Sequence, residues 1–150
     1  MLRAWQQQCI DSAFDSFNNH KHHFLAQATP GAGKTFMAAN LAKRMFENQM
    51  IDFVICFSPS KTVSKSIAEC FSSELNCPFD GKLGTLGSSI TYQSLRHIRE
   101  HFWETLSKYR VLCIFDEIHH VVGRLGIPTD IQQLHHVAIG GEKDEFFDLA

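Results

Sequence analysis

Short apolar runs of strand length alternate with amphipathic helical stripes four times along this chain. Two of the runs, IDFVICF at 51–57 and YRVLCIF at 109–115, are rich in the β-branched and aromatic residues that favour buried strands. Between the runs, apolar residues recur at helical spacing. Strands that alternate with helices indicate βαβ units and a parallel sheet. The sequence therefore predicts one doubly wound α/β domain over residues 1–150, with a mostly parallel sheet and helices on both faces.

Composition narrows the class of protein. The 150 residues fit one domain, and a hydrophobic share of 44% is enough for a buried core. The net charge of −2 gives no overall basic field, so any basic surface would be local. No apolar run approaches the roughly 20 residues of a membrane span, and the N-terminus is too polar for a signal peptide. Cys56 and Cys113 lie in apolar runs, as buried cysteines do. We therefore expect a cytoplasmic protein without a membrane partner.

The segment QATPGAGKT at 27–35 lies between the apolar run HFLA and a helical stripe. A strand, a glycine loop and a helix in this order are typical of a phosphate-binding loop. Gly31 and Gly33 permit backbone angles that turn successive N–H groups inward, and the helix adds the positive end of its dipole. We expect Lys34 to bind the β- and γ-phosphates and Thr35 to bind Mg²⁺. The predicted loop consists of Thr29, Pro30, Gly31, Ala32, Gly33, Lys34 and Thr35.

An acidic pair follows the second buried run, in the sequence VLCIFDE. Ligands of open α/β sheets bind outside the carboxyl ends of the strands, which is where this run places Asp116. Asp116 is predicted to hold the Mg²⁺ shell, and Glu117 to polarise the attacking water. With Lys34 these two are the predicted catalytic residues. The prediction requires Lys34 and Asp116 to meet at one rim of the sheet.

ATPGAGKT, with Ala28 where the usual loop has its first glycine, and DEIH at 116–119 resemble known helicase motifs. The chain is similar to the first RecA-like domain of superfamily-two helicases and translocases, in the DExH branch. The resemblance implies ATP and Mg²⁺ as cofactors and a nucleic acid as partner, with DNA favoured over RNA. It also implies that His119 couples the ATP site to strand movement. Full activity would need a second RecA-like domain, in cis or in trans.

Three weaker matches follow in the order of that family. LRAWQ resembles its adenine-recognition motif, which implies that Gln6 binds the base. FSPSK resembles the turn that touches the nucleic-acid strand, with Ser58, Pro59 and Ser60 as contacts. TYQSL is similar to an element of the branch that includes restriction-enzyme translocase subunits and DNA-repair helicases, with Thr91 as a phosphate contact.

The resemblance to the family ends at about residue 122, and the family's next element, a central strand, has no clear match in the sequence that follows. The family places a central strand, ending in a Thr- or Ser-rich tripeptide, between the glycine-loop strand and the acidic strand. The only strand-like run here is LHHVAI at 134–139, followed by two glycines instead of hydroxyl residues. Either 134–139 is a degenerate substitute, or the chain is truncated after the DExH motif and lacks the strand. In both cases 124–150 is an atypical tail.

Two functions compete. The first is the ATP-binding motor domain of a nucleic-acid-dependent ATPase, which hydrolyses ATP to move along or remodel DNA. The alternative is a truncated or decayed helicase fragment that binds nucleotide without significant turnover, because it lacks the arginine finger of a second domain. A small kinase or GTPase fits less well, since no guanine-reading N-K-x-D occurs. Lys61, Lys65 and Arg96 form either a basic rim for phosphates or a set of solvated helix charges.

Overall fold

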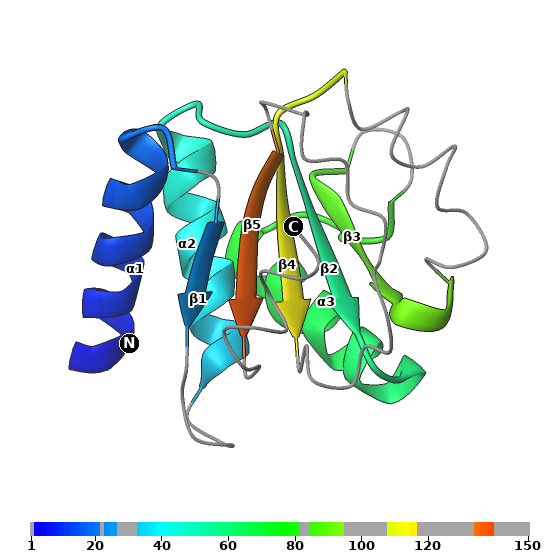
Figure 1. The fold of residues 1–150 in the computed structure, drawn as a ribbon. Coiled ribbons are helices and arrows are strands. Elements are labelled where there is room, and N and C mark those ends of the chain that lie inside the picture. The colour runs from blue at the N-terminus through cyan, green and yellow to red at the C-terminus, as the bar shows by residue number, and fades with distance from the viewer. Residues whose placement is uncertain are drawn as a thin grey trace.

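The computed structural model describes residues 2–21, 23–26, 33–81, 85–94, 108–116 and 134–139. Within these residues, five parallel strands form one sheet in the order β1-β5-β4-β2-β3, and three long helices pack beside it (Figure 1). The strands are β1 (His23–Ala26), β2 (Phe53–Ser58), β3 (Gly87–Thr91), β4 (Val111–Asp116) and β5 (Leu134–Ile139). The helices are α1 (Ala4–Asn18), α2 (Lys34–Glu47) and α3 (Lys61–Leu75). The predicted α/β class with a parallel sheet is confirmed.

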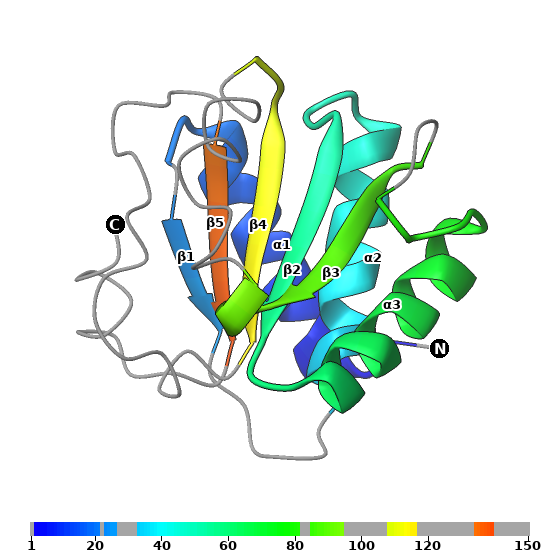
Figure 2. The same cartoon turned by 90° about the vertical axis from the view of Figure 1, so that its right-hand side faces the viewer.

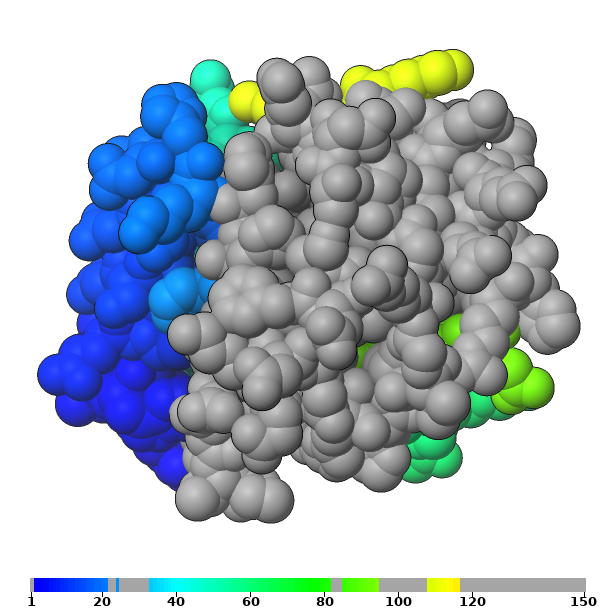
Figure 3. Space-filling view, in the orientation of Figure 1, coloured from blue at the N-terminus to red at the C-terminus, as the bar shows by residue number. Residues whose placement is uncertain are grey.

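The three helices form a layer on one face of the sheet (Figure 2). α2 is the middle helix of this layer, because it contacts both α1 and α3. α1 lies beside β1 and forms one flank of the molecule, where its outer residues are exposed (Figure 3). The helices predicted for the opposite face fall outside the described residues.

β5 decides between the two alternatives for the central strand. It pairs with β1 on one side and with β4 on the other, both in parallel. Residues 134–139 therefore occupy the position between the glycine-loop strand and the acidic strand, so the sheet does not lack its middle strand. Without β5, the facing edges of β1 and β4 would expose rows of backbone groups that need partners.

The core lies between the helix layer and the central strands. In α2 the predicted stripe of Met37, Leu41 and Met45 is fully buried. β2 and β4 are buried along nearly their whole length, as their apolar sequences predict. Cys56 and Cys113 have no exposed surface, as expected from their apolar runs.

Local signals explain where the helices begin and end. The Ser60 hydroxyl accepts a hydrogen bond from the Val63 N–H at 3.2 Å, which caps the start of α3. The same helix ends at Asn76 in the left-handed conformation, with φ 54°. Among the described residues, none forms a helix with the length and hydropathy that a bilayer crossing requires.

Candidate nucleotide and nucleic-acid site

The carboxyl ends of all five strands lie at one edge of the sheet, which we call the carboxyl edge (Figure 1). The register places the last residues of β1, β5 and β4, which are Ala26, Ile139 and Asp116, in one row. Neighbouring strands are about 4.8 Å apart, so β1 and β4 are separated by roughly 10 Å. α2 also begins at this edge, with Lys34 as its first residue. The structure thus brings Lys34 and Asp116 to the same rim.

The end of the glycine loop has a conformation that favours glycine. Gly33 is the N-cap of α2, with φ 86° and ψ 35° in the left-handed region. Its carbonyl accepts the first helical hydrogen bond, from the Met37 N–H at 3.1 Å. Lys34 and Thr35 follow in the first turn of α2 and are partly exposed. The other predicted loop residues, Thr29, Pro30, Gly31 and Ala32, lie outside the described residues.

Gln6 lies directly against this loop, although 27 positions separate it from Gly33. Its side chain is almost fully buried, with 2% exposed, and its Nε2 donates to the Gly33 carbonyl oxygen at 2.9 Å. Its Oε1 accepts from the Arg3 N–H at 2.7 Å, which closes the first turn of α1. A Cβ atom at Gly33 would lie only 2.6 Å from Gln6 Nε2. The contact therefore needs glycine at position 33, while the adenine contact of Gln6 stays a prediction.

The backbone at the acidic end of β4 is hydrogen-bonded to a residue that follows β3. The Tyr92 hydroxyl donates to the Asp116 carbonyl oxygen at 2.8 Å. Tyr92 is 5% exposed and follows β3 directly. The motif TYQSL indicated only its threonine as a contact, so this role of Tyr92 was not predicted. The other two residues of the acidic motif with predicted roles, Glu117 and His119, lie outside the described residues.

The predicted strand contacts differ in their exposure. Pro59 and Ser60 are exposed at the turn between β2 and α3. Ser58 is fully buried, and its hydroxyl donates to the Ser60 carbonyl oxygen at 3.4 Å. Ser58 therefore shapes the turn from inside, and its side chain is not at the surface where a direct strand contact was expected. Thr91 Oγ1 accepts from the Ser94 N–H at 3.1 Å and donates to its hydroxyl, so Thr91 caps the turn that follows β3.

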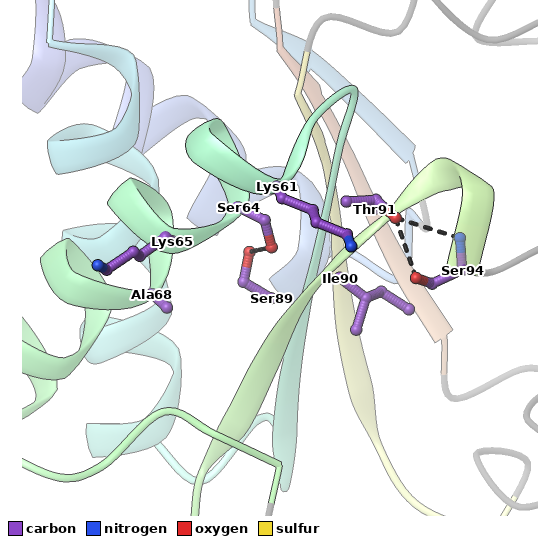
Figure 4. Close-up of a pocket in the computed structure, with 8 residues that line it drawn as sticks. All are labelled: Lys61, Ser64, Lys65, Ala68, Ser89, Ile90, Thr91 and Ser94. Atoms are coloured by element: carbon purple, nitrogen blue, oxygen red, sulfur yellow. Dashed lines mark hydrogen bonds between the residues drawn. The ribbon is translucent and has the colours of Figure 1, made fainter.

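A pocket of about 310 Å³ lies between α3 and the end of β3 (Figure 4). Lys61 extends across it toward Thr91, whereas Lys65 points away along α3 (Figure 4). The Ser64 and Ser89 hydroxyls are 2.9 Å apart and join the helix to the strand. The described residues that line the pocket include two lysines and no carboxylate, which suits an anion. They are Lys61, Ser64, Lys65, Ala68, Ser89, Ile90, Thr91 and Ser94.

The part of the chain that the structure describes shows no candidate metal centre of histidine, cysteine or carboxylate ligands. There, no group of three His, Cys, Asp or Glu side chains lies close enough to hold a metal ion.

The parallel sheet, the glycine loop before α2 and the acidic end of β4 define the class of protein: a RecA-like domain of helicase type. The family model for the type III restriction enzyme, res subunit, matches residues 1–139. The chain belongs to this family, whose members are helicase-type ATPase motor domains, and it is the first RecA-like domain of a superfamily-two helicase. The resemblance seen in the motifs is thus confirmed at the level of the family.

Similar proteins are much longer than this chain. Two uncharacterized proteins of Mycobacterium tuberculosis, from strains CDC 1551 / Oshkosh and ATCC 25618 / H37Rv, are each 27% identical over 129 residues. The match covers 79% of this chain and 21% of either relative. A solved structure, a nuclease-deletion mutant of the Type ISP restriction-modification enzyme LlaGI in complex with a DNA substrate mimic, has a similar fold. Its TM-score is 0.62 at 16% identity, over 100% of this chain and 19% of that one.

Proposed function

We propose that this chain is the ATP-binding motor domain of a nucleic-acid-dependent ATPase, which hydrolyses ATP to move along or remodel DNA. The observation that carries the proposal is the shared carboxyl edge. Lys34 begins α2 there, and Asp116 ends β4 there, two strand intervals from β1.

The residues at the edge suit ATP and Mg²⁺. Thr35 offers a hydroxyl and Asp116 a carboxylate, and Mg²⁺ prefers such oxygen ligands. The start of α2 presents backbone N–H groups and the positive end of the helix dipole to the phosphates, and Lys34 adds a charge. Bound Mg²⁺ would neutralise charge that develops on the phosphates, and Glu117 would orient the water that attacks them.

The nucleic-acid strand would bind beside the nucleotide, on the surface formed by the turn after β2 and the turn after β3. Ser60 and Thr91 belong to these turns, and Lys61 stands between them. Phosphate contacts of this kind are independent of base sequence and suit a protein that moves along a strand. DNA is the favoured partner because the Type ISP enzyme of similar fold was solved with a DNA substrate mimic. A second RecA-like domain would complete the site for full activity.

Nucleotide binding tests the site. Lys34→Ala should weaken the affinity for Mg-ATP at least tenfold, which is about 1.4 kcal/mol, because it removes the charge nearest the phosphates. Isothermal titration calorimetry measures the affinity. Lys43→Ala is the matched control, since Lys43 lies on the exposed face of the same helix. Equal affinities for wild type and Lys34→Ala would refute the site.

Turnover then separates the motor from the alternative. ATP hydrolysis by the wild-type chain should rise when single-stranded DNA is added. Nucleotide binding without strand-stimulated hydrolysis would instead favour a domain that binds ATP and turns over only negligibly.

A further inference from the structure

Tyr92 connects the two halves of the proposed site. On one side it follows Thr91, which caps the exposed turn where a strand would bind. On the other side its hydroxyl donates to the Asp116 carbonyl oxygen at 2.8 Å, at the position proposed to hold Mg²⁺. The two bonded residues are 24 positions apart in the sequence. No intervening side chain is needed to carry a displacement from one to the other.

Packing fixes the direction of the Tyr92 ring. Its ring stacks with that of Phe57, with centroids 6.4 Å apart and planes inclined by 19°. Phe57 in turn stacks with Phe115, at 4.9 Å and 17°. Phe57 and Phe115 are fully buried, and they pair across β2 and β4. The aromatic row therefore holds the ring laterally, while the hydroxyl is hydrogen-bonded to the Asp116 carbonyl oxygen.

We propose that Tyr92 is a positioning residue that couples strand binding at the Thr91 turn to metal–nucleotide binding at Asp116. The inference rests on the proposed function, because it needs both ligands. A strand phosphate that pulls on the Thr91 turn shifts the Tyr92 hydroxyl, and the hydrogen bond shifts the backbone of Asp116. Such coupling is reciprocal: the strand changes nucleotide affinity by the same factor by which nucleotide changes strand affinity. One hydrogen bond supports a factor of roughly two to ten.

The experiment compares the full chain with two conservative variants. Tyr92→Phe removes only the hydroxyl and keeps the ring stacked on Phe57, so the domain should fold. Tyr109→Phe is the matched control. Tyr109 precedes β4 at the opposite end of the sheet, with 41% of its surface exposed and its ring nearly perpendicular to that of Phe53. The Kd of a fluorescent ATP analogue with Mg²⁺ is measured without and with saturating oligothymidylate. The ratio of the two Kd values is the coupling factor.

We expect a ratio of roughly two to ten for wild type and for Tyr109→Phe. For Tyr92→Phe the ratio should fall to about one, while the affinity for oligothymidylate alone changes less than about twofold. A residue that only stabilises the fold would not change the ratio. A wild-type ratio in Tyr92→Phe overturns the inference, and so does a wild type that binds both ligands with a ratio of one. Failure of the proposed function looks different, because the wild-type chain then binds no Mg-nucleotide or no strand, and the inference falls with it.

Discussion

Replacing Gly33 with alanine tests whether the loop before α2 is held as the structure describes. Two features of this position oppose a side chain. The backbone has φ 86°, in the left-handed region, and the new Cβ would lie 2.6 Å from Gln6 Nε2. Since real Cβ contacts are not this short, the Gln6 amide must move. Its hydrogen bond to the Gly33 carbonyl oxygen is then lost.

The expected loss of stability has two parts. A left-handed conformation costs a residue with a Cβ about 1–2 kcal/mol. Loss of the Gln6 hydrogen bond costs about 0.5–1.5 kcal/mol more. The sum of about 1.5–3.5 kcal/mol corresponds to a fall in Tm of about 3–14 °C for a domain of this size.

Urea unfolding followed by far-UV circular dichroism measures these free energies. A double-mutant cycle separates the two parts, because Gln6→Ala removes the group with which the new Cβ would collide. In that background Gly33→Ala should cost only the backbone strain, which leaves a coupling of about 1 kcal/mol between the two positions. Gly81→Ala is a control for strain alone. Gly81 has φ 73°, and a Cβ there would meet only Ser88 side-chain atoms, at 3.1 Å.

The cycle can refute the reasoning. If the costs of Gly33→Ala and Gln6→Ala add to within about 0.3–0.5 kcal/mol, the two residues are not in contact in the folded protein. If Gly33→Ala lowers the free energy of unfolding by no more than Gly81→Ala does, the close approach of Gln6 does not exclude a side chain at position 33. Either result would refute the contact between Gln6 of α1 and the glycine loop.

Two further predictions concern groups with shifted pKa values. Burial raises the pKa of the Cys56 and Cys113 thiols. Iodoacetamide should therefore label neither thiol in the folded chain at mildly alkaline pH, but both in urea. Mass spectrometry of peptides measures the labelling, and equal rates in the folded and the unfolded chain would contradict the prediction. The hydrogen bond from the Arg110 guanidinium lowers the pKa of the Asp52 carboxyl. Because both side chains are largely exposed, this ion pair stabilises the fold by less than about 1 kcal/mol. The stabilisation is present above the unfolded pKa of Asp52, near 4, and is lost as the pH falls through its lower pKa in the folded protein. Asp52→Asn should therefore flatten the acid limb of the stability curve measured by urea unfolding, and an unchanged slope would contradict this.

Local patterns predicted most of the described fold, because local packing determines it. Met37, Leu41 and Met45 recur at helical spacing, and the same residues form the buried face of α2. The apolar runs became β2 and β4 for a similar reason. The run 134–139 was ambiguous, since two histidines interrupt it and no hydroxyls follow it. Its place depends on backbone pairing with β1 and β4, which no property of its own side chains reveals.

The candidate site was predictable only in outline. Parallel strands end at one edge of the sheet, so the order of the motifs in the sequence predicts that the glycine loop and Asp116 lie there together. The contacts of Gln6 with Gly33 and of Tyr92 with Asp116 bridge 27 and 24 positions, and neither has a spacing rule. Ser58 and Ser60 look alike in the sequence, so the pattern does not indicate that their exposure differs. The strand ends between them, so the first serine stays inside the sheet and the second is exposed.

The two long-range hydrogen bonds differ in what they can transmit. Gln6 of α1 donates to the Gly33 carbonyl at the end of the glycine loop, and α1 contains none of the predicted strand contacts. Tyr92 reaches the acidic end from the turn that Thr91 caps, which does contain one. The printed hydrogen bonds of Gln6 therefore give a route to the glycine loop but reach neither of the two turns proposed to contact the strand. If nucleotide binding in this domain changes the affinity for a strand, the described residues link the two sites through the Tyr92 hydroxyl and the row of aromatic rings that holds the Tyr92 ring.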